Sequence, residues 1–458
     1  MKLQNITTKV DNKQNFKGAD PYKTLTGALK VADLFIQSQE NLSSTRFIQD
    51  TATNWFPKAV FARSKADFAE MTFLEMLESG IFYFALPILG EKVLRNNVFK
   101  HIPHKNIKSQ VNELIPKTLN QIKNSNVQSE IKKQAVSSKA GILLACALIP
   151  IAEYTLSFAK NLFTLKTFKT SDFNKIAKLD KEPKTHDTRL TPEEKAQQER
   201  VEKNSKKQLK KAGLLSLGFL AAGLALAKNG SKSESLQKIA QSIIEPGQAV
   251  ASGLGKLGVK NDKLNNILSK FSLDFASNNG KLALGKGQFA LTAILGLFGY
   301  SKAAEDRGKL DVAEVWTRVP LVVFYTIFGS ELFEKGFINL LAKKNKFPDL
   351  IQKDKLGKLT VPTREQLPKL AETLAKQNKT QATDELKKLV KQKTFTTAIP
   401  YAFALLFMGF TLSAITRLWT QFRYNHQQKQ EQKSNNHTLL NFQRNLPPLY
   451  KDFAKKNV

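Results

Sequence analysis

The chain has 458 residues, enough for two or three ordinary domains or for one polytopic membrane unit. Lysine and arginine total 71 against 39 acidic residues, a formal net charge of +32, which predicts anionic partners such as phospholipid head groups or nucleic acid. The single cysteine, Cys146, excludes a disulfide framework or a cysteine-based zinc site within one chain. Lysine far outnumbers arginine, and lysine is poorly suited to reading bases, so sequence-specific binding of nucleic acid is not expected.

The N-terminal segment 1–54 is polar and has no apolar run followed by a small-residue cleavage site, so no cleavable signal peptide is expected. Beyond it, apolar segments alternate with lysine-rich ones. In chain order the apolar segments are 80–90, 141–159, 212–227, 287–301, 319–330 and 394–416. The last has 23 uncharged residues between Lys393 and Arg417, which is long enough to cross a bilayer. The others are shorter and fit membrane spans, re-entrant hairpins or buried core helices.

The polar stretches between these segments are also informative. Residues 166–211 are rich in lysine and contain a helix start, with Thr191 as the N-cap and Pro192 at the first helical position. Residues 228–286 are rich in Ser, Gly and Asn, which indicates a flexible connection, and residues 425–458 form a basic tail. Strand patterns are scarce. The sequence therefore predicts an all-α fold, as a polytopic helical membrane protein.

An internal repeat is suggested by two nine-residue stretches. "RSKADFAEM" at 63–71 and "RGKLDVAEV" at 307–315 share Arg, Lys, Asp, Ala and Glu at the same spacing. Further matches follow in the same order, ending with "TLSFAKNLFT" at 155–164 and "TLSAITRLWT" at 411–420. The competing explanation is independent helices drawn from a lysine-rich composition. We interpret the matches as two copies of one unit, joined by a lysine-rich linker with two short apolar segments.

Copy 1 spans 55–168, the linker spans 169–298, and copy 2 spans 299–424. Each copy consists of a charged lead helix, an apolar segment, a basic amphipathic connection and a second apolar segment. If all six apolar segments cross the membrane, the copies share one orientation and form a parallel repeat, whereas the copies are inverted if either middle segment, 212–227 or 287–301, fails to span. A mixture of spanning and interfacial helices, or a soluble helical bundle, would also fit the pattern.

The shared motif predicts ion pairs. Arg63 and Asp67 are four residues apart, as are Arg307 and Asp311, so each pair can close on the surface of a helix. The motif is either a solvated helix at the membrane surface or a repeated docking site for the other copy, a partner or lipid head groups. Its residues are Arg63, Lys65, Asp67 and Glu70 in copy 1, and Arg307, Lys309, Asp311 and Glu314 in copy 2.

Three carboxylates are candidates for a polar path. Glu75 and Glu78 share one helical face at the entrance to the first apolar segment, and Glu153 interrupts the second. A carboxylate in a bilayer costs a few kcal/mol unless it is paired or hydrated, so these residues could line a substrate, proton or ion path. Alternatively, they lie near the head groups or pair across the copies, for example Glu75 or Glu78 with Arg318.

The sequence contains no strong catalytic motif and no cluster of metal ligands, so no cofactor is expected. We expect a non-enzymatic integral membrane protein, in the bacterial cytoplasmic membrane, acting as a scaffold whose basic helices engage anionic lipid head groups or acidic partners. A homo-oligomer or a second protein is an alternative partner. The alternative functions are a transporter or channel with a polar path at the repeat interface, and a basic peripheral protein that binds nucleic acid non-specifically. The nucleic-acid partner is the least favoured.

Overall fold

The computed structural model describes residues 20–40, 51, 54–179, 190–258, 262–269, 271–278, 281–353 and 357–445. Within these ranges the fold is almost wholly helical, and the strands are limited to two short antiparallel hairpins. The prediction of an all-α fold is therefore confirmed.

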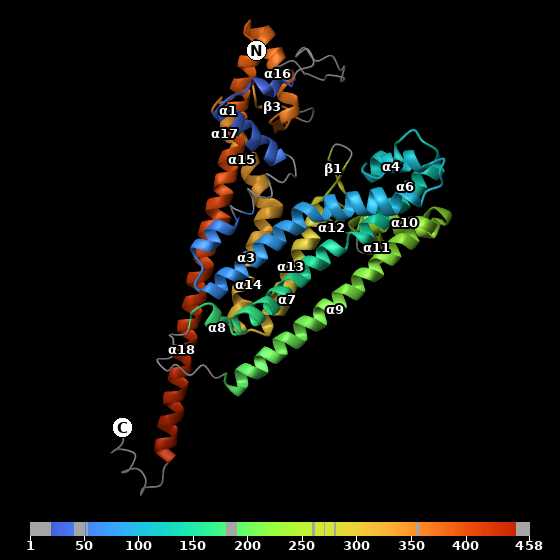
Figure 1. Cartoon of the computed structure of the whole chain (residues 1–458). Helices are drawn as coiled ribbons and strands as arrows, with labels where there is room; N and C mark the ends of the chain where they lie inside the picture. Colours follow the sequence, from blue (N-terminus) through green and yellow to red (C-terminus); the bar gives the residue numbers. More distant parts are fainter. Residues whose placement is uncertain are drawn as a thin grey trace.

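The first half of the chain forms a long helical hairpin (Figure 1). Ser64 caps its first helix, because the Ser64 Oγ accepts a hydrogen bond from the backbone N–H of Asp67 at 3.0 Å. The hairpin is preceded by two short elements, η1 (Pro21–Thr24) and α1 (Ala28–Glu40). Its own elements are α3 (Lys65–Gly80), the π-helical η2 (Ile81–Val98), η3 (Phe99–His101), α4 (Lys108–Leu114), α5 (Leu119–Lys123), α6 (Ser129–Ala145), α7 (Leu148–Phe168) and α8 (Phe173–Ile176).

The middle of the chain begins with one long helix, α9 (Pro192–Asn229). Its start is the predicted one, since Thr191 and Glu194 form a capping box ahead of Pro192. The elements that follow are η4 (Gly230–Lys232), α10 (Glu234–Ile244), α11 (Pro246–Lys256), α12 (Asp262–Ser269), β1 (Ala276–Asn278), β2 (Lys281–Ala283) and α13 (Lys286–Glu305). Strands β1 and β2 pair in register with Ser277 opposite Leu282.

The prediction of a flexible connection at 228–286 is wrong for the described residues, which form helices α10 to α12 and a β-hairpin. Helix α10 buries Ala240 and Ile244 in the main hydrophobic core, and Phe275 and Leu282 join the same core. The Ser- and Asn-rich composition concealed these few apolar residues at helical spacing. Apolar spacing, and not average composition, decided the structure here.

The second half forms another helical hairpin, and its descending arm is one continuous rod (Figure 1). Helix α1 packs against this arm through α17. The elements are α14 (Lys309–Phe324), the π-helical η5 (Tyr325–Gly329), α15 (Ser330–Lys343), β3 (Gln352–Lys353), β4 (Leu359–Thr360), η6 (Arg364–Gln366), α16 (Leu367–Asn378), α17 (Ala382–Ala404), the π-helical η7 (Leu405–Thr411) and α18 (Leu412–Asn445).

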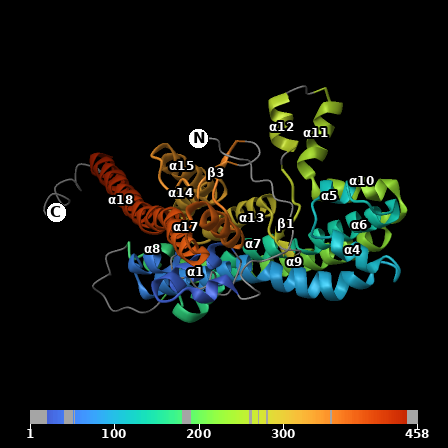
Figure 2. The ribbon, with the colours of Figure 1, turned by 90° about the horizontal axis from the view of Figure 1, so that it is seen from above.

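The long helices run alternately away from one end of the molecule and back to it. Figure 1 shows α3, α9 and α14 leading away from one end of the molecule, while α7, α13 and α17–α18 lead back to it. Helix α7 packs against α9 and α13, and α14 packs against α13 and α18. Seen from above, the second hairpin gathers around α14, α15 and α17, apart from the group formed by α4, α6 and α10 (Figure 2).

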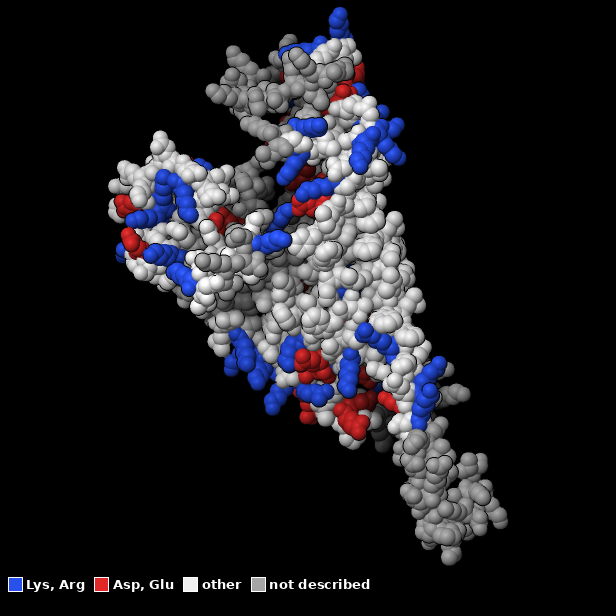
Figure 3. Space-filling model, turned by 180° about the vertical axis from the view of Figure 1, so that it is seen from behind, with Lys and Arg blue, Asp and Glu red and all other residues white. Residues whose placement is uncertain are grey.

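Four helical stretches in the described residues are long and apolar enough to cross a membrane: Lys65–His101, Ser129–Phe168, Pro192–Lys232 and Ala382–Ser434. In three of them, Lys65–His101, Pro192–Lys232 and Ala382–Ser434, only 22%, 17% and 17% of the residues in the apolar window are buried within the protein. Figure 3 shows a broad expanse of uncharged side chains between charged residues toward either end. The apolar segments 287–301 and 319–330 are helical but are not among the four.

Helices α6 and α9 touch at two glycines. A side chain at Gly223 would collide with the backbone carbonyl of Gly141, and a side chain at Gly141 would collide with that of Gly223. Gly218, on an exposed part of α9, has open space around it. The small residues of 212–227 thus serve internal packing at Gly223.

We expect Gly223→Leu to destabilise the protein by about 3 kcal/mol or more, because the two backbones must separate to admit the side chain. Gly218→Leu, on the same helix, should change the free energy of unfolding by less than about 0.5 kcal/mol. Unfolding of both variants in mixed detergent micelles measures the difference, and equal effects would argue against the α6–α9 contact.

Candidate functional site

The two charged motifs meet where α3 and α14 begin. The Arg63 guanidinium donates two hydrogen bonds to the Glu314 carboxylate, at 3.0 and 3.1 Å. The Arg307 guanidinium donates to the Glu70 carboxylate at 3.0 Å. In each motif the glutamate lies seven residues after the arginine, and each arginine reaches the glutamate of the other motif. Such a reciprocal exchange is what a twofold axis produces.

Within each motif the arginine also contacts the aspartate four residues later. The Nε–Oδ2 distance is 3.2 Å for Arg63–Asp67 and 3.3 Å for Arg307–Asp311. These predicted ion pairs are confirmed, but their predicted place on the surface is wrong. Arg307 is 2% exposed and Asp311 6% exposed. Spacing along one helix identifies neighbours on that helix and says nothing about which other helices cover them.

The descending helices α7 and α18 contribute one polar residue each at matching positions. Asn161 of α7 accepts a hydrogen bond from Arg307 at 3.1 Å and donates one to the backbone carbonyl of Ala303 at 3.0 Å. Arg417 of α18 donates to Asp67 at 3.0 Å. Asn161 and Arg417 occupy the same position in the aligned stretches 155–164 and 411–420, and each reaches the lead motif of the other hairpin.

Two threonines complete the arrangement. The hydroxyl of Thr420 donates to Glu314 at 2.8 Å, and Thr164, at the matching position, interacts with Glu70. Lys160 adds a further positive charge 3.5 Å from Glu70. No motif in the sequence singled out these residues, although the alignment of 155–164 with 411–420 contained the signal.

Helix α8 lies between the two arginines. The Phe173 ring lies 5.4 Å from the guanidinium carbon of Arg63 and 6.0 Å from that of Arg307, within range of a cation–π interaction. Burial would lower the pKa of Arg63, but the carboxylates of Glu314 and Asp67 outweigh it and raise the pKa above its ordinary value. Both motif lysines, Lys65 and Lys309, are exposed. We call the paired arginines, aspartates and glutamates the crossed ion-pair network.

The three candidate carboxylates of the polar path lie together beside this network. Glu75 forms an ion pair with Lys58, and Arg318 lies 3.6 Å from the same carboxylate. The pairing of Glu75 with Arg318 suggested by the sequence is therefore present. Glu78 and Glu153 are electrostatic neighbours of each other and of Glu75.

Glu153 is the most buried of the three. Its Oε1 accepts a hydrogen bond from the Tyr300 hydroxyl at 3.4 Å, and its Oε2 has no partner within the described residues. The side chain is 2% exposed and packs against Gly296 of α13. The neighbouring cations, Lys58 and Arg318, lie against Glu75. A buried carboxylate without a partner is costly, so this position favours binding a proton or a cation.

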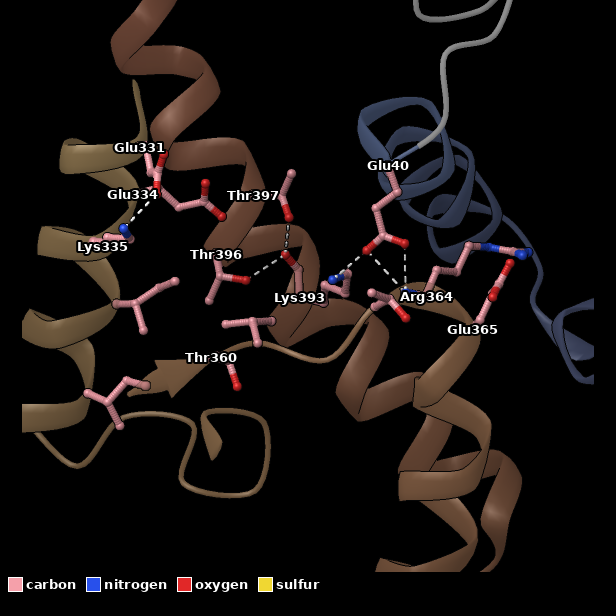
Figure 4. Close-up of a pocket in the computed structure, with 14 residues that line it drawn as sticks. Glu40, Glu331, Glu334, Lys335, Thr360, Arg364, Glu365, Lys393, Thr396 and Thr397 are labelled. Atoms are coloured by element: carbon pink, nitrogen blue, oxygen red, sulfur yellow. Dashed lines mark hydrogen bonds and ion pairs between the residues drawn. The ribbon is translucent and has the colours of Figure 1, made fainter. Parts of the chain in front are cut away.

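A separate charged cavity of about 590 Å³ lies between α1, α15, η6 and α17 (Figure 4). Buried Lys393 donates to the Pro362 carbonyl and pairs with Glu40 at 2.6 Å. Arg364 pairs with Asp33 at 2.6 Å. These contacts tie the N-terminal helix α1 to the second hairpin, so the charges around this cavity serve largely to hold the fold.

Tyr22 strengthens the same attachment. Its hydroxyl donates to the backbone carbonyl of Arg364, whose guanidinium carbon lies 3.7 Å from the centre of the Tyr22 ring. Burial raises the pKa of Tyr22 above its ordinary value, so the phenol remains protonated and able to donate. The sequence marks this region only as polar, and no pattern within it points to Tyr22.

No protein-family model, curated protein or solved structure matches this chain. The function must therefore be inferred from the geometry of the site.

The pair Arg63–Glu314 offers a direct energetic test. Arg63→Met leaves the half-buried Glu314 without its main partner, and we expect a loss of about 2 kcal/mol in the free energy of unfolding. The double variant with Glu314→Met should lose less than the sum of the single variants, giving a coupling of about 2 kcal/mol. As a control, the exposed pair Asp384–Lys387 should couple by less than about 0.5 kcal/mol. Additive effects at Arg63 and Glu314 would show that the two side chains do not depend on each other.

The carboxylates of the polar cluster should respond differently to the same substitution. Glu75→Gln removes the charge that pairs with Lys58 and Arg318, so we expect a destabilisation of about 2 kcal/mol. Glu153→Gln keeps the shape and removes a charge that lacks a positive partner, so stability should stay the same or rise. Thermal unfolding of both variants in detergent measures the order, and the reverse order would refute the assignment of partners.

Proposed function

We propose that the chain is an integral membrane protein built from two copies of one hairpin unit, 55–168 and 299–424, related by an approximate twofold axis. The crossed ion-pair network supports this, because Arg63–Glu314 and Arg307–Glu70 exchange equivalent residues. The matching roles of Asn161 and Arg417 support it further. Both lead helices also change to π-helical geometry at nearly the same position, Ile81 in copy 1 and Tyr325 in copy 2.

The contacts favour a parallel repeat. Arg63 meets Glu314 near the beginning of the two lead helices, and Glu75 meets Arg318 further along both. The helices therefore run in the same direction, as can be followed in Figure 1. Along the sequence, α9 and most of α13 lie between the two copies. Helix α9 runs away from the network end and α13 runs back to it (Figure 1), so the chain returns to its starting side before the lead helix of copy 2 begins. The twofold axis would then lie along the membrane normal.

Tryptophan positions support a membrane boundary at the level of the network. Trp316 follows Glu314 by two residues, and Trp419 directly precedes Thr420, the partner of Glu314. Trp55 donates to Thr72, which follows Glu70 by two residues. Trp316 and Trp419 are 48% and 44% exposed. Tryptophan gathers at the membrane–water interface, where its ring is apolar and its N–H can reach water.

The function that the geometry supports best is a non-enzymatic scaffold whose basic segments engage anionic lipid head groups. The observation that carries it is a division of the charges. Those between the hairpins pair with one another, while lysines at the ends of the helices are exposed. A joint closed by one buried and one half-buried ion pair fixes the hairpins against each other. The exposed lysines next to apolar helices are then placed to meet phosphate groups.

Extraction of membranes from expressing cells at alkaline pH in carbonate tests this proposal. We expect the full chain to remain in the membrane pellet and to be released only by detergent. Release by carbonate or high salt would contradict the proposal and would favour the peripheral protein that binds nucleic acid through charge.

A second candidate function, transport, is favoured by one observation, the unpaired Glu153 oxygen among Glu75 and Glu78 at the interface between the copies. A proton or cation path would use this carboxylate. Proton flux into proteoliposomes should then be present for the natural chain and absent for Glu153→Gln. No flux, or flux that survives the substitution, would rule out this path and leave the scaffold.

A further inference from the structure

An apolar groove of about 350 Å³ opens on the surface between η2, α7 and α9. Most of its side chains are aliphatic, and most are half-buried, so the groove is accessible from outside. Its lining residues are Ile81, Ala85 and Leu89 from η2, Leu148, Ile149, Ile151, Ala152 and Thr155 from α7, and Leu209, Ala212, Gly213 and Ser216 from α9. All three helices belong to stretches that are apolar enough to span a membrane.

Exposed lysines lie beyond one end of the groove, on the same two helices α7 and α9. On α9, Lys206 precedes the lining residue Leu209 by three residues and therefore lies beside the face that lines the groove. Lys210 follows Lys206 by four residues, about one helical turn. On α7, Lys166 follows Thr155 by eleven residues, three helical turns along the same face. Lys166 is near enough to act on the charge of Glu202, which pairs with Lys206 at 2.6 Å.

The charge at this end of the groove is positive. Glu202 pairs with Lys206 and is the electrostatic neighbour of Lys166, so one carboxylate faces two lysines and the group keeps a net positive charge, to which Lys210 adds. Lys207 and Lys211 lie on the opposite side of α9 by helical spacing. An apolar groove with cations beyond one end has the same division of chemistry as an anionic phospholipid, which has a hydrocarbon chain below a phosphate.

We infer that the groove binds one acyl chain of an anionic phospholipid, with its phosphate held by Lys166 and Lys206. This inference rests on the proposed membrane location and names the lipid class that the scaffold engages. The long aliphatic stems of both lysines can lie along the apolar helices while their ammonium groups reach the head-group level.

Native mass spectrometry of the full chain in detergent, with added dioleoyl phosphatidylglycerol or dioleoyl phosphatidylcholine, tests the inference. The two lipids have the same chains and differ in head-group charge. We expect the natural chain to prefer phosphatidylglycerol. Lys166→Gln with Lys206→Gln should lower its affinity about twenty-five-fold, since each lysine near a phosphate contributes roughly a fivefold gain. The matched control, Lys207→Gln with Lys211→Gln, should change affinity by less than about twofold.

A second variant fills the groove. Gly213 lines it and has no atom within 4 Å of an added Cβ, so Gly213→Phe can be accommodated without a backbone clash. We expect this variant to lose binding of both lipids, whereas Gly218→Phe, which is outside the groove on the same helix, should bind as the natural chain does. Thermal unfolding of each variant establishes that it is folded.

Two results separate the lipid groove from the proposed function. If the preference for phosphatidylglycerol survives both the groove-filling variant and the Lys166/Lys206 variant, the groove assignment is wrong while the scaffold proposal stands. If the natural chain shows no preference between the lipids, the groove assignment and the proposed engagement of anionic lipids both fail.

Discussion

Two arginines, buried Arg307 and half-buried Arg63, are each neutralised by carboxylates from both hairpins and fix how the halves of this protein meet. A buried charge that loses its partner costs several kcal/mol, so Arg63 and Arg307 permit few alternative arrangements of α3 against α14. Helices α7 and α18 then add Asn161 and Arg417 to the same network, which fixes the descending arms as well. Phe173 fills the space between the guanidinium groups. The polar cluster around Glu75 and the outward-facing apolar helices take their positions from this joint.

The distribution of polarity is the reverse of that in a water-soluble bundle. Ion pairs lie between the helices, while many apolar side chains of α9, α17 and α18 point outward. In water this arrangement would expose a large apolar surface, and in a bilayer it is the expected one. The main hydrophobic core lies instead at the far end of the first hairpin, where Ile115, Ile122 and Ile244 pack together. The chain thus combines a membrane-like middle with a conventional core at one end.

The sequence predicted local features well and three-dimensional surroundings poorly. The spacing in the motifs gave the pairs Arg63–Asp67 and Arg307–Asp311, and the alignment of copies gave Glu75 with Arg318. Burial of the motifs was missed, because it depends on α7, α8 and α18, which are distant in sequence. Phe173 had no pattern to mark it. The role of 228–286 was misjudged because composition was weighed above apolar spacing.

In the proposed arrangement, both hairpins cross the membrane in the same orientation and are related by an axis that passes through the crossed ion-pair network. Single cysteines placed in a Cys146→Ser background test it most directly, with a membrane-impermeant maleimide applied to intact cells and to inverted vesicles. We predict that Asn124→Cys and Gln377→Cys, at the far ends of the two hairpins, label from one side, and that Lys195→Cys and Glu305→Cys, at the network end, label from the other. Labelling of positions 124 and 377 from opposite sides, or of all four positions from one side, would contradict the parallel arrangement.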